Sequence, residues 1–77
     1  MTREEQYQST REKFNRIISS QYTIEFLNKG DGIIAASISN GIEVFWIGEK
    51  WFSKSASSKY INGYFRSVTN SLIKRFQ

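Results

Sequence analysis

The spacing of apolar residues changes along the chain, and each spacing predicts one kind of element. In the first twenty residues, Phe14 and Ile17 recur at helical spacing, which predicts a helix. Alternation with a period of two over 22–27, followed by apolar runs at 33–39 and 42–47, predicts three strands. A second helix in the last third completes the order of elements.

This second helix carries the broadest apolar stripe in the chain. Its members step by three or four residues, as one face of a helix requires: Ile61, Phe65, Val68, Leu72 and Phe76. We expect this face to cover the sheet. Gly63 costs about 1 kcal/mol relative to Ala inside a helix, so we expect close backbone approach or a local irregularity there.

The pair Asn40-Gly41 separates the second and third apolar runs and is typical of a type I′ hairpin. A two-residue turn there pairs Ile38 with Glu43, and a longer loop between the first two strands pairs Leu27 with Ile33. The predicted fold class is therefore α+β with the order α-β-β-β-α. It consists of a three-stranded antiparallel meander covered on one face mainly by the C-terminal helix.

The length of 77 residues fits a single domain, 1–77. The chain has no Cys and no His, which excludes disulfides, zinc fingers, Cys nucleophiles and His general bases. The predicted register places Glu25 and Glu43 on opposite faces, so it assembles no catalytic pair of carboxylates. We expect no enzymatic activity, no metal site and no cofactor.

The hydropathy along the chain predicts no membrane association. The N-terminal residues are polar, and no stretch approaches the roughly 18 apolar residues that span a bilayer. A basic, aromatic helix at 60–76 is also compatible with a membrane surface, but the apolar sheet face needs that helix as its cover. We expect a cytoplasmic protein.

Positive charge is concentrated in the last third of the chain. Residues 1–28 carry four cations and four acids, whereas residues 49–77 carry six cations against Glu49 alone. Cations interleaved with aromatic rings are typical of surfaces that contact phosphates and stack on bases. We expect a nucleic-acid-binding domain, and its candidate contacts are Lys50, Trp51, Lys54, Lys59, Tyr60 and Arg66. Alternatively, these cations serve only solubility.

Trp46 is predicted on the sheet face away from the core, beside Val44. An exposed Trp lowers solubility unless something covers it. Val44 and Trp46 are therefore the candidate contacts of a second hypothesis, a protein-binding module or small inhibitor that acts through this face or an exposed edge strand. Alternatively, the first helix, the segment around Trp51-Phe52 or a second copy of the chain covers the face. The last of these alternatives makes the protein a homodimer.

The order helix, three-stranded antiparallel meander, helix resembles that of the double-stranded RNA-binding domain. Lys54 and Lys59 lie where that family keeps its phosphate-binding lysines, so the resemblance implies nucleic-acid binding there. The resemblance is one of architecture, because Ser57-Ser58-Lys59 replaces the family's Lys-Lys-x-Ala-Lys cluster and its Gly-Pro-x-His loop has no counterpart. In size and composition the chain is also similar to small phage-encoded inhibitors such as some anti-CRISPR proteins, which implies the protein-binding alternative.

Overall fold

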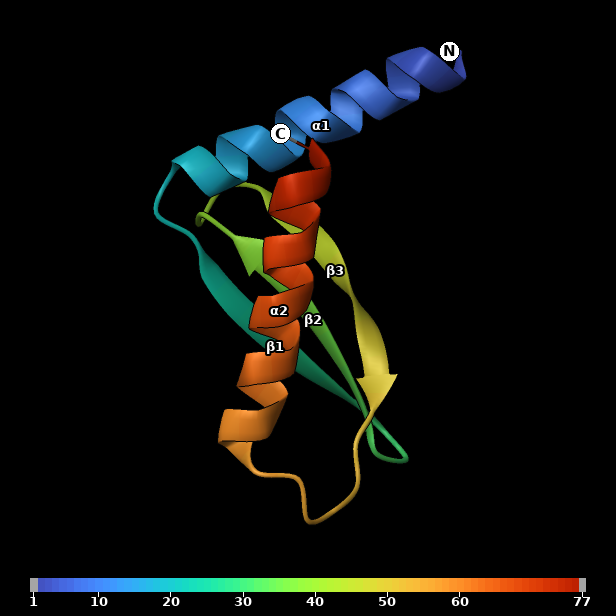
Figure 1. Ribbon diagram of the computed structural model, residues 1–77, viewed down its shortest axis with the longest axis vertical. Coiled ribbons are helices and arrows are strands. Elements are labelled where there is room, and N and C mark those ends of the chain that lie inside the picture. Colours follow the sequence, from blue (N-terminus) through green and yellow to red (C-terminus); the bar gives the residue numbers. More distant parts are fainter. Residues whose placement is uncertain (1, 77) are drawn as a thin grey trace.

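Two helices and three strands follow one another in the order expected from the sequence. The computed structural model describes residues 2–76 (Figure 1). Its elements are α1 (Arg3–Ser19), β1 (Thr23–Gly30), β2 (Ile33–Ser39), β3 (Val44–Trp51) and α2 (Ser58–Phe76). The strands form one antiparallel sheet in the order β1-β2-β3. The predicted fold class, including the cover of one sheet face by α2, is confirmed.

The buried residues of α1 come from its C-terminal half, whereas the first half contacts the rest of the chain through the partly exposed Tyr7 ring, 5.8 Å from that of Phe76. Thr2 caps the helix, and its Oγ1 accepts a hydrogen bond from the backbone N–H of Glu5 at 3.2 Å. The buried residues of α1 are Phe14 and Ile17, while residues 2–10 are all exposed. The first turns of α1 therefore project past the sheet, as Figure 1 shows.

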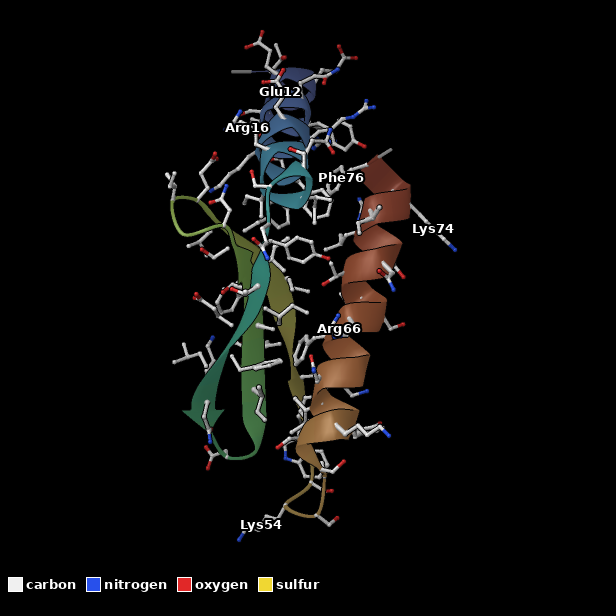
Figure 2. All side chains as sticks on the ribbon, turned by 90° about the vertical axis from the view of Figure 1, so that its left-hand side faces the viewer. Glu12, Arg16, Lys54, Arg66, Lys74 and Phe76 are labelled. Carbon is white, nitrogen blue, oxygen red and sulfur yellow. The ribbon has the colours of Figure 1, made fainter. Side chains whose placement is uncertain are left out.

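Three phenylalanine rings join α1, β3 and α2. The ring of Phe14 lies 4.9 Å from that of Phe45 and 5.0 Å from that of Phe76, measured between centroids. Ile17 and Ile38 are fully buried beside these rings. A second cluster on the same side of the sheet contains Phe65 of α2. Both helices therefore pack on one face, and within residues 2–76 no helix covers the other face (Figure 2).

The hairpin between β1 and β2 has a two-residue turn instead of the predicted longer loop. Asp31 and Gly32 form this turn, with φ of 54° and 80°. A type I′ turn requires positive φ at both central residues, and Asp-Gly is among its preferred pairs. The strands therefore extend further than expected, and Leu27 pairs with Ala35 rather than with Ile33.

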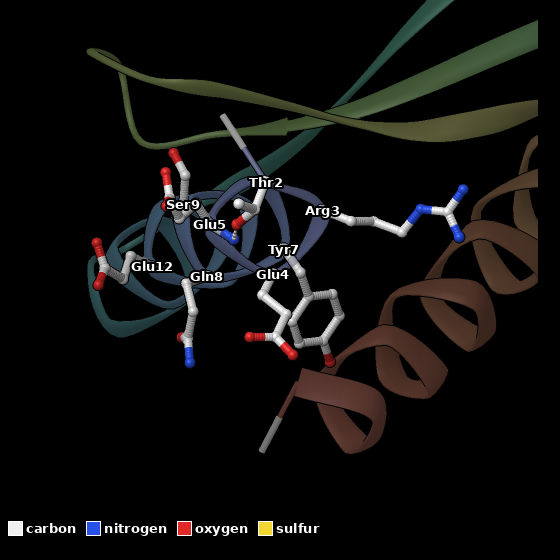
Figure 3. A pocket seen from close by; sticks show the side chains of 8 residues that line it. All are labelled: Thr2, Arg3, Glu4, Glu5, Tyr7, Gln8, Ser9 and Glu12. Atoms are coloured by element: carbon white, nitrogen blue, oxygen red, sulfur yellow. Dashed lines mark hydrogen bonds between the residues drawn. The ribbon is translucent and has the colours of Figure 1, made fainter.

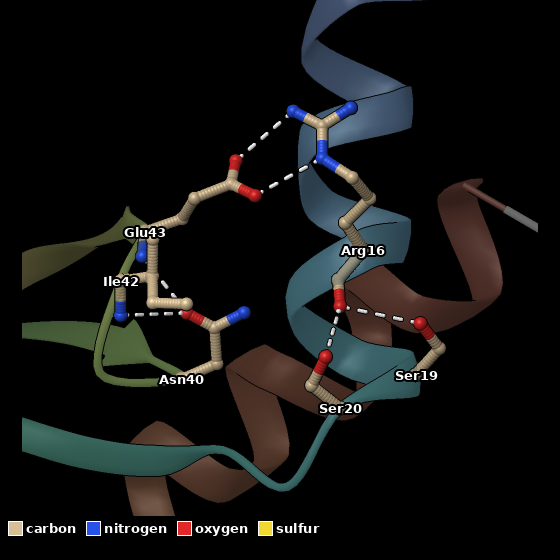
Figure 4. Close-up of polar contacts among 6 residues, drawn as sticks. All are labelled: Arg16, Ser19, Ser20, Asn40, Ile42 and Glu43. Atoms are coloured by element: carbon tan, nitrogen blue, oxygen red, sulfur yellow. Dashed lines mark hydrogen bonds and ion pairs between the residues drawn. The ribbon is translucent and has the colours of Figure 1, made fainter.

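The hairpin between β2 and β3 is the reverse case, because the two-residue turn predicted at Asn40-Gly41 does not form. Gly41 has a positive φ of 93°, but Asn40 does not. Instead, the Asn40 Oδ1 accepts hydrogen bonds from the backbone N–H groups of Ile42 and Glu43 (Figure 4), at 3.0 and 2.8 Å. The loop therefore includes Glu43, and Ile38 pairs with Phe45 rather than with Glu43.

An ion pair fixes this longer loop to α1. The guanidinium of Arg16 donates two hydrogen bonds of 3.0 Å to the carboxylate of Glu43 (Figure 4). These hydrogen bonds raise the pKa of Arg16 and lower the pKa of Glu43. Because the pair draws Glu43 toward α1, it favours the wide loop over a tight turn.

A β-bulge interrupts β3 and determines where the side chains beyond it point. Ser37 pairs with Trp46, but the next residue of β2, Ala36, pairs with Gly48. The extra residue reverses the alternation of faces after Trp46. Lys50 consequently lies on the helix-covered face, and Trp51 lies on the opposite face.

The expectation of close approach or irregularity at Gly63 is wrong. A Cβ added to Gly63 meets no atom within 4 Å, and Ser58–Phe76 is a continuous α-helix. Packing therefore gives no reason for glycine at this position.

Candidate nucleic-acid interface

Three cations of α2 are exposed to solvent, away from its buried side. Phe65, Thr69 and Phe76 are buried and fix which side of the helix faces the sheet. Lys59, Arg66 and Lys74 are exposed on other sides of the helix. They are separated by seven and eight residues, which is about 10 and 12 Å along the helix axis. Figure 2 shows Lys74 pointing away from the sheet.

Small polar residues separate these cations on the solvent side of α2. Gly63, Ser67 and Asn70 are all exposed there. Because none of these side chains is long, a ligand can approach the helix backbone between the cations. We call Lys59, Arg66 and Lys74, together with these small residues, the basic face of α2; Lys54 lies in the loop that precedes this helix.

The start of α2 is unusually positive. Ser57 caps the helix, and its Oγ accepts a hydrogen bond from the Tyr60 N–H at 3.1 Å. The first turn of α1 contains Glu4 and Glu5, whereas the first turn of α2 contains no acid and does contain Lys59. The positive end of the α2 dipole is therefore not compensated within the helix.

Charge compensation is confined to the first two thirds of the chain. The ion pairs found among residues 2–76 join Arg16 to Glu43 and Lys29 to Glu49. The sequence has no Asp or Glu after Glu49. The cations after Lys50 therefore have no acid nearby in sequence, and they are Lys54, Lys59, Arg66, Lys74 and Arg75.

The structure brings some of the sequence-predicted contacts together and separates others. Lys54 lies in the loop at one end of the molecule (Figure 2), and Lys59 and Tyr60 follow in the first turn of α2. The Tyr60 side chain is 58% exposed, although its ring packs edge-on against Phe52. Arg66 lies two turns further along the helix.

Lys50 and Trp51 are adjacent in sequence but lie on opposite faces of the sheet. The Nζ of Lys50 lies 4.3 Å from the centroid of the Tyr64 ring, next to α2. Trp51 pairs with Ile33 on the other face, and its indole lies close to Gly32. Trp51 is therefore not part of the basic face of α2.

Sequence reasoning did not select Lys74 as a contact. Lys74 lies 15 residues after Lys59, close to four helical turns, so both project from the same side of α2. Helical spacing from Lys59 is the signal that identifies Lys74 as part of the same side of α2, and it identifies Gly63 and Asn70 in the same way.

The face of the sheet away from the helices exposes large apolar side chains. Val44 and Trp46, the contacts predicted for a protein partner, are 51% and 52% exposed there, and Leu27 and Trp51 share the face. The first helix does not cover Trp46, because α1 packs on the other face through Phe14. We call Leu27, Val44, Trp46 and Trp51 the bare sheet face.

Charges on the bare sheet face distinguish it from α2. The Nζ of Lys29 lies 5.5 Å from the Trp46 ring and 2.8 Å from Glu49 Oε2. Glu25 lies on the same face, opposite Ser37. Acidic side chains therefore accompany these aromatic rings, which does not suit a phosphate backbone.

A hollow at the start of α1 is lined by side chains from Thr2 to Glu12 (Figure 3). All of these residues belong to one exposed helix or its cap. Ligand sites are normally enclosed by several elements, so this hollow is not a candidate site. Among residues 2–76, no three His, Cys, Asp or Glu side chains gather as metal ligands.

Comparison of the chain with protein-family models, with curated proteins and with solved structures finds no match. None of the helices within residues 2–76 combines the length and apolar character needed to cross a bilayer.

Proposed function

We propose that this domain binds nucleic acid through the phosphate backbone, using the basic face of α2. The observation that carries the proposal is the row formed by Lys59, Arg66 and Lys74 on a helix whose surroundings in sequence lack any acid. Cations of this kind release counterions from nucleic acid when they neutralise phosphates, and this supplies most of the non-specific binding free energy.

The residues between the cations suit the same ligand. Ser67 and Asn70 carry hydrogen-bond donors that can reach phosphate oxygens. Gly63 leaves the helix surface open, and the first N–H groups of α2 favour an anion near Lys59. Because phosphates are the same in every sequence, we expect binding with little sequence preference.

The salt dependence of binding tests this proposal. Four phosphate contacts, made by Lys54, Lys59, Arg66 and Lys74, give a slope of about −3.6 in a plot of log affinity against log salt for duplex DNA. Affinity should therefore fall by about 150-fold between 50 and 200 mM salt. A double variant, Lys59→Gln with Arg66→Gln, should reduce the slope to about −1.8.

The control changes the same net charge elsewhere. Arg3 and Lys13 are exposed on α1, so Arg3→Gln with Lys13→Gln should leave the slope unchanged. An equal loss in both double variants would mean that only net charge matters. Affinity weaker than about 10⁻⁴ M at 50 mM salt, for both DNA and RNA, would end the proposal.

A second candidate function is recognition of a protein, as in a binding module or a small inhibitor. It is favoured by Trp46, which is half exposed beside Val44 on the bare sheet face. Aromatic side chains in such positions are common binding hot spots. Binding of this kind should be insensitive to salt, and Trp46→Ala should abolish it while Lys59→Gln does not.

A further inference from the structure

β1 is an edge strand that exposes apolar side chains on both of its faces. Every residue of β1 except Ile24 is exposed. Phe26 on the helix side is 47% exposed, and Leu27 on the bare sheet face is 57% exposed. Figure 2 views the molecule from the β1 side, and no element lies in front of this strand. The outer hydrogen-bonding groups of β1 are therefore available to another strand.

The other edge of the sheet is less suited to pairing. β3 contains a bulge between Trp46 and Gly48, and Gly48 has a φ of 150°. Bulges twist an edge and interrupt the regular row of donors and acceptors. In β1 the only register shift lies between Asn28 and Gly30, so Thr23–Asn28 is regular. This stretch contains neither Pro nor Lys, and its one charged residue is Glu25.

The side chains of β1 are complementary to a second copy of the same strand. Two antiparallel copies related by a two-fold axis perpendicular to the sheet must pair residues that lie on the same face. With Leu27 on the axis, Leu27 meets its symmetry mate. Glu25 of each copy then lies near Lys29 of the other, which sits in the bulge of β1 and whose ammonium reaches this face. A shift that puts Glu25 on the axis would bring two acids together.

Lys29 can bind Glu25 of the second copy in addition to its own partner, Glu49. Its ammonium is paired with Glu49, yet its side chain remains 44% exposed. An ammonium has three donors, so a second carboxylate can be bound beside Glu49. On the other face, Phe26 lies diagonally across from its symmetry mate, within reach of an aromatic ring.

We infer that the protein forms a homodimer in which the two β1 strands pair antiparallel, with Leu27 at the two-fold axis. The product is one six-stranded sheet in the order β3-β2-β1-β1-β2-β3. This dimer does not depend on the nucleic-acid function, because the basic face of α2 takes no part in the contact. It leaves Trp46 exposed, since Trp46 lies on the strand furthest from the axis.

Crosslinking tests the dimer directly, because the chain has no natural Cys. Leu27→Cys places two Cβ atoms roughly 4.5–5.5 Å apart across the axis, so oxidation or a short bismaleimide should link two copies. Val44→Cys is the matched control, since it is similarly exposed on the same face. In the proposed dimer the two copies of β3 lie five strand spacings apart, about 24 Å, so this variant should not crosslink.

Sedimentation equilibrium without nucleic acid provides the second measurement. The apparent mass should rise from 9.0 kDa toward twice that value with concentration, and Glu25→Lys should shift the protein to monomer at the same concentration. A monomer at all concentrations up to about 1 mM would overturn the proposal. Crosslinking of Val44→Cys but not of Leu27→Cys would also overturn it, because it would show pairing through the bare sheet face. Loss of nucleic-acid binding alone would leave the dimer standing.

Discussion

Removal of the Phe14 ring should separate α1 from the rest of the domain. Phe14 is 1% exposed and packs on both Phe45 and Phe76. Truncation of a buried Phe to Ala costs about 3–5 kcal/mol, and the two aromatic contacts place Phe14 well within that range. Ala is the better helix former, but only by about 0.5 kcal/mol. Because a domain of this size has roughly 4–12 kcal/mol of stability, Phe14→Ala should lose much of it.

Urea unfolding followed by circular dichroism measures this loss. With an m-value of about 1.5 kcal/mol/M, the midpoint for Phe14→Ala should fall by about 2–3 M. If that variant does not fold, Phe14→Leu should fold and lose about 1–2 kcal/mol, since it keeps most of the apolar volume. Tyr7→Ala is the control, because Tyr7 is 45% exposed with its ring 5.8 Å from Phe76. A midpoint for Phe14→Ala no lower than that for Tyr7→Ala would refute the packing of α1 on the sheet.

Two further predictions concern α2 and the wide hairpin loop. Gly63→Ala should stabilise the protein by about 0.5–1 kcal/mol, because Ala is the better helix former and the added methyl group meets no atom within 4 Å. The melting temperature Tm should rise by roughly 2–8 °C. A lower Tm in calorimetry would contradict this prediction. The pKa of Glu43 is lowered by its hydrogen bonds to Arg16. The stabilisation from Glu43 is therefore complete above the pKa of Glu in the unfolded chain, about 4.3, and it is lost as pH falls through the lower pKa of Glu43 in the folded protein. The difference in stability between wild type and Glu43→Gln should therefore be largest near pH 7 and shrink in acid, and a difference that is constant with pH would exclude this ion pair as its source.

Apolar periodicity predicted the elements correctly, but it did not predict the turns. Two pairs in the chain, Asp31-Gly32 and Asn40-Gly41, are compatible with a type I′ turn. Only the first forms one, because Arg16 binds Glu43 and the Asn40 side chain accepts two backbone hydrogen bonds. The Arg16–Glu43 contact joins residues 27 positions apart in sequence, so local propensity could not choose between the two pairs.

The faces of most strand residues were nevertheless predicted correctly. Both hairpin registers differ from the expected ones by two residues, and an even shift leaves each side chain on its face. The bulge in β3 is an odd shift, so Lys50 and Trp51 lie on the faces opposite to those that uninterrupted alternation along β3 would give. An isolated glycine inside a strand often marks a bulge, and Gly48 was the available signal. Helical spacing would likewise have added Lys74 to the candidate contacts on α2.

The dimer and the basic face of α2 together lead to one further prediction. A two-fold axis perpendicular to the sheet maps each face onto itself, so both α2 helices lie on the same side of the six-stranded sheet. A duplex of about 30 base pairs, roughly 100 Å at 3.4 Å per base pair, is long compared with a single copy, whose longest extent is 42 Å. Such a duplex can therefore reach both basic faces.

Covalent linkage should therefore increase affinity only for the long duplex. At concentrations where reduced Leu27→Cys is monomeric, the oxidised dimer should bind this duplex about 10²–10⁴ times more tightly than the reduced form, because the second contact becomes intramolecular. A duplex of about 8 base pairs, roughly 27 Å, should show no such gain. Equal affinities of the two forms for the long duplex would mean that the two basic faces cannot bind one duplex together. The dimer and the phosphate contact would then be independent properties of the chain, each resting on its own test.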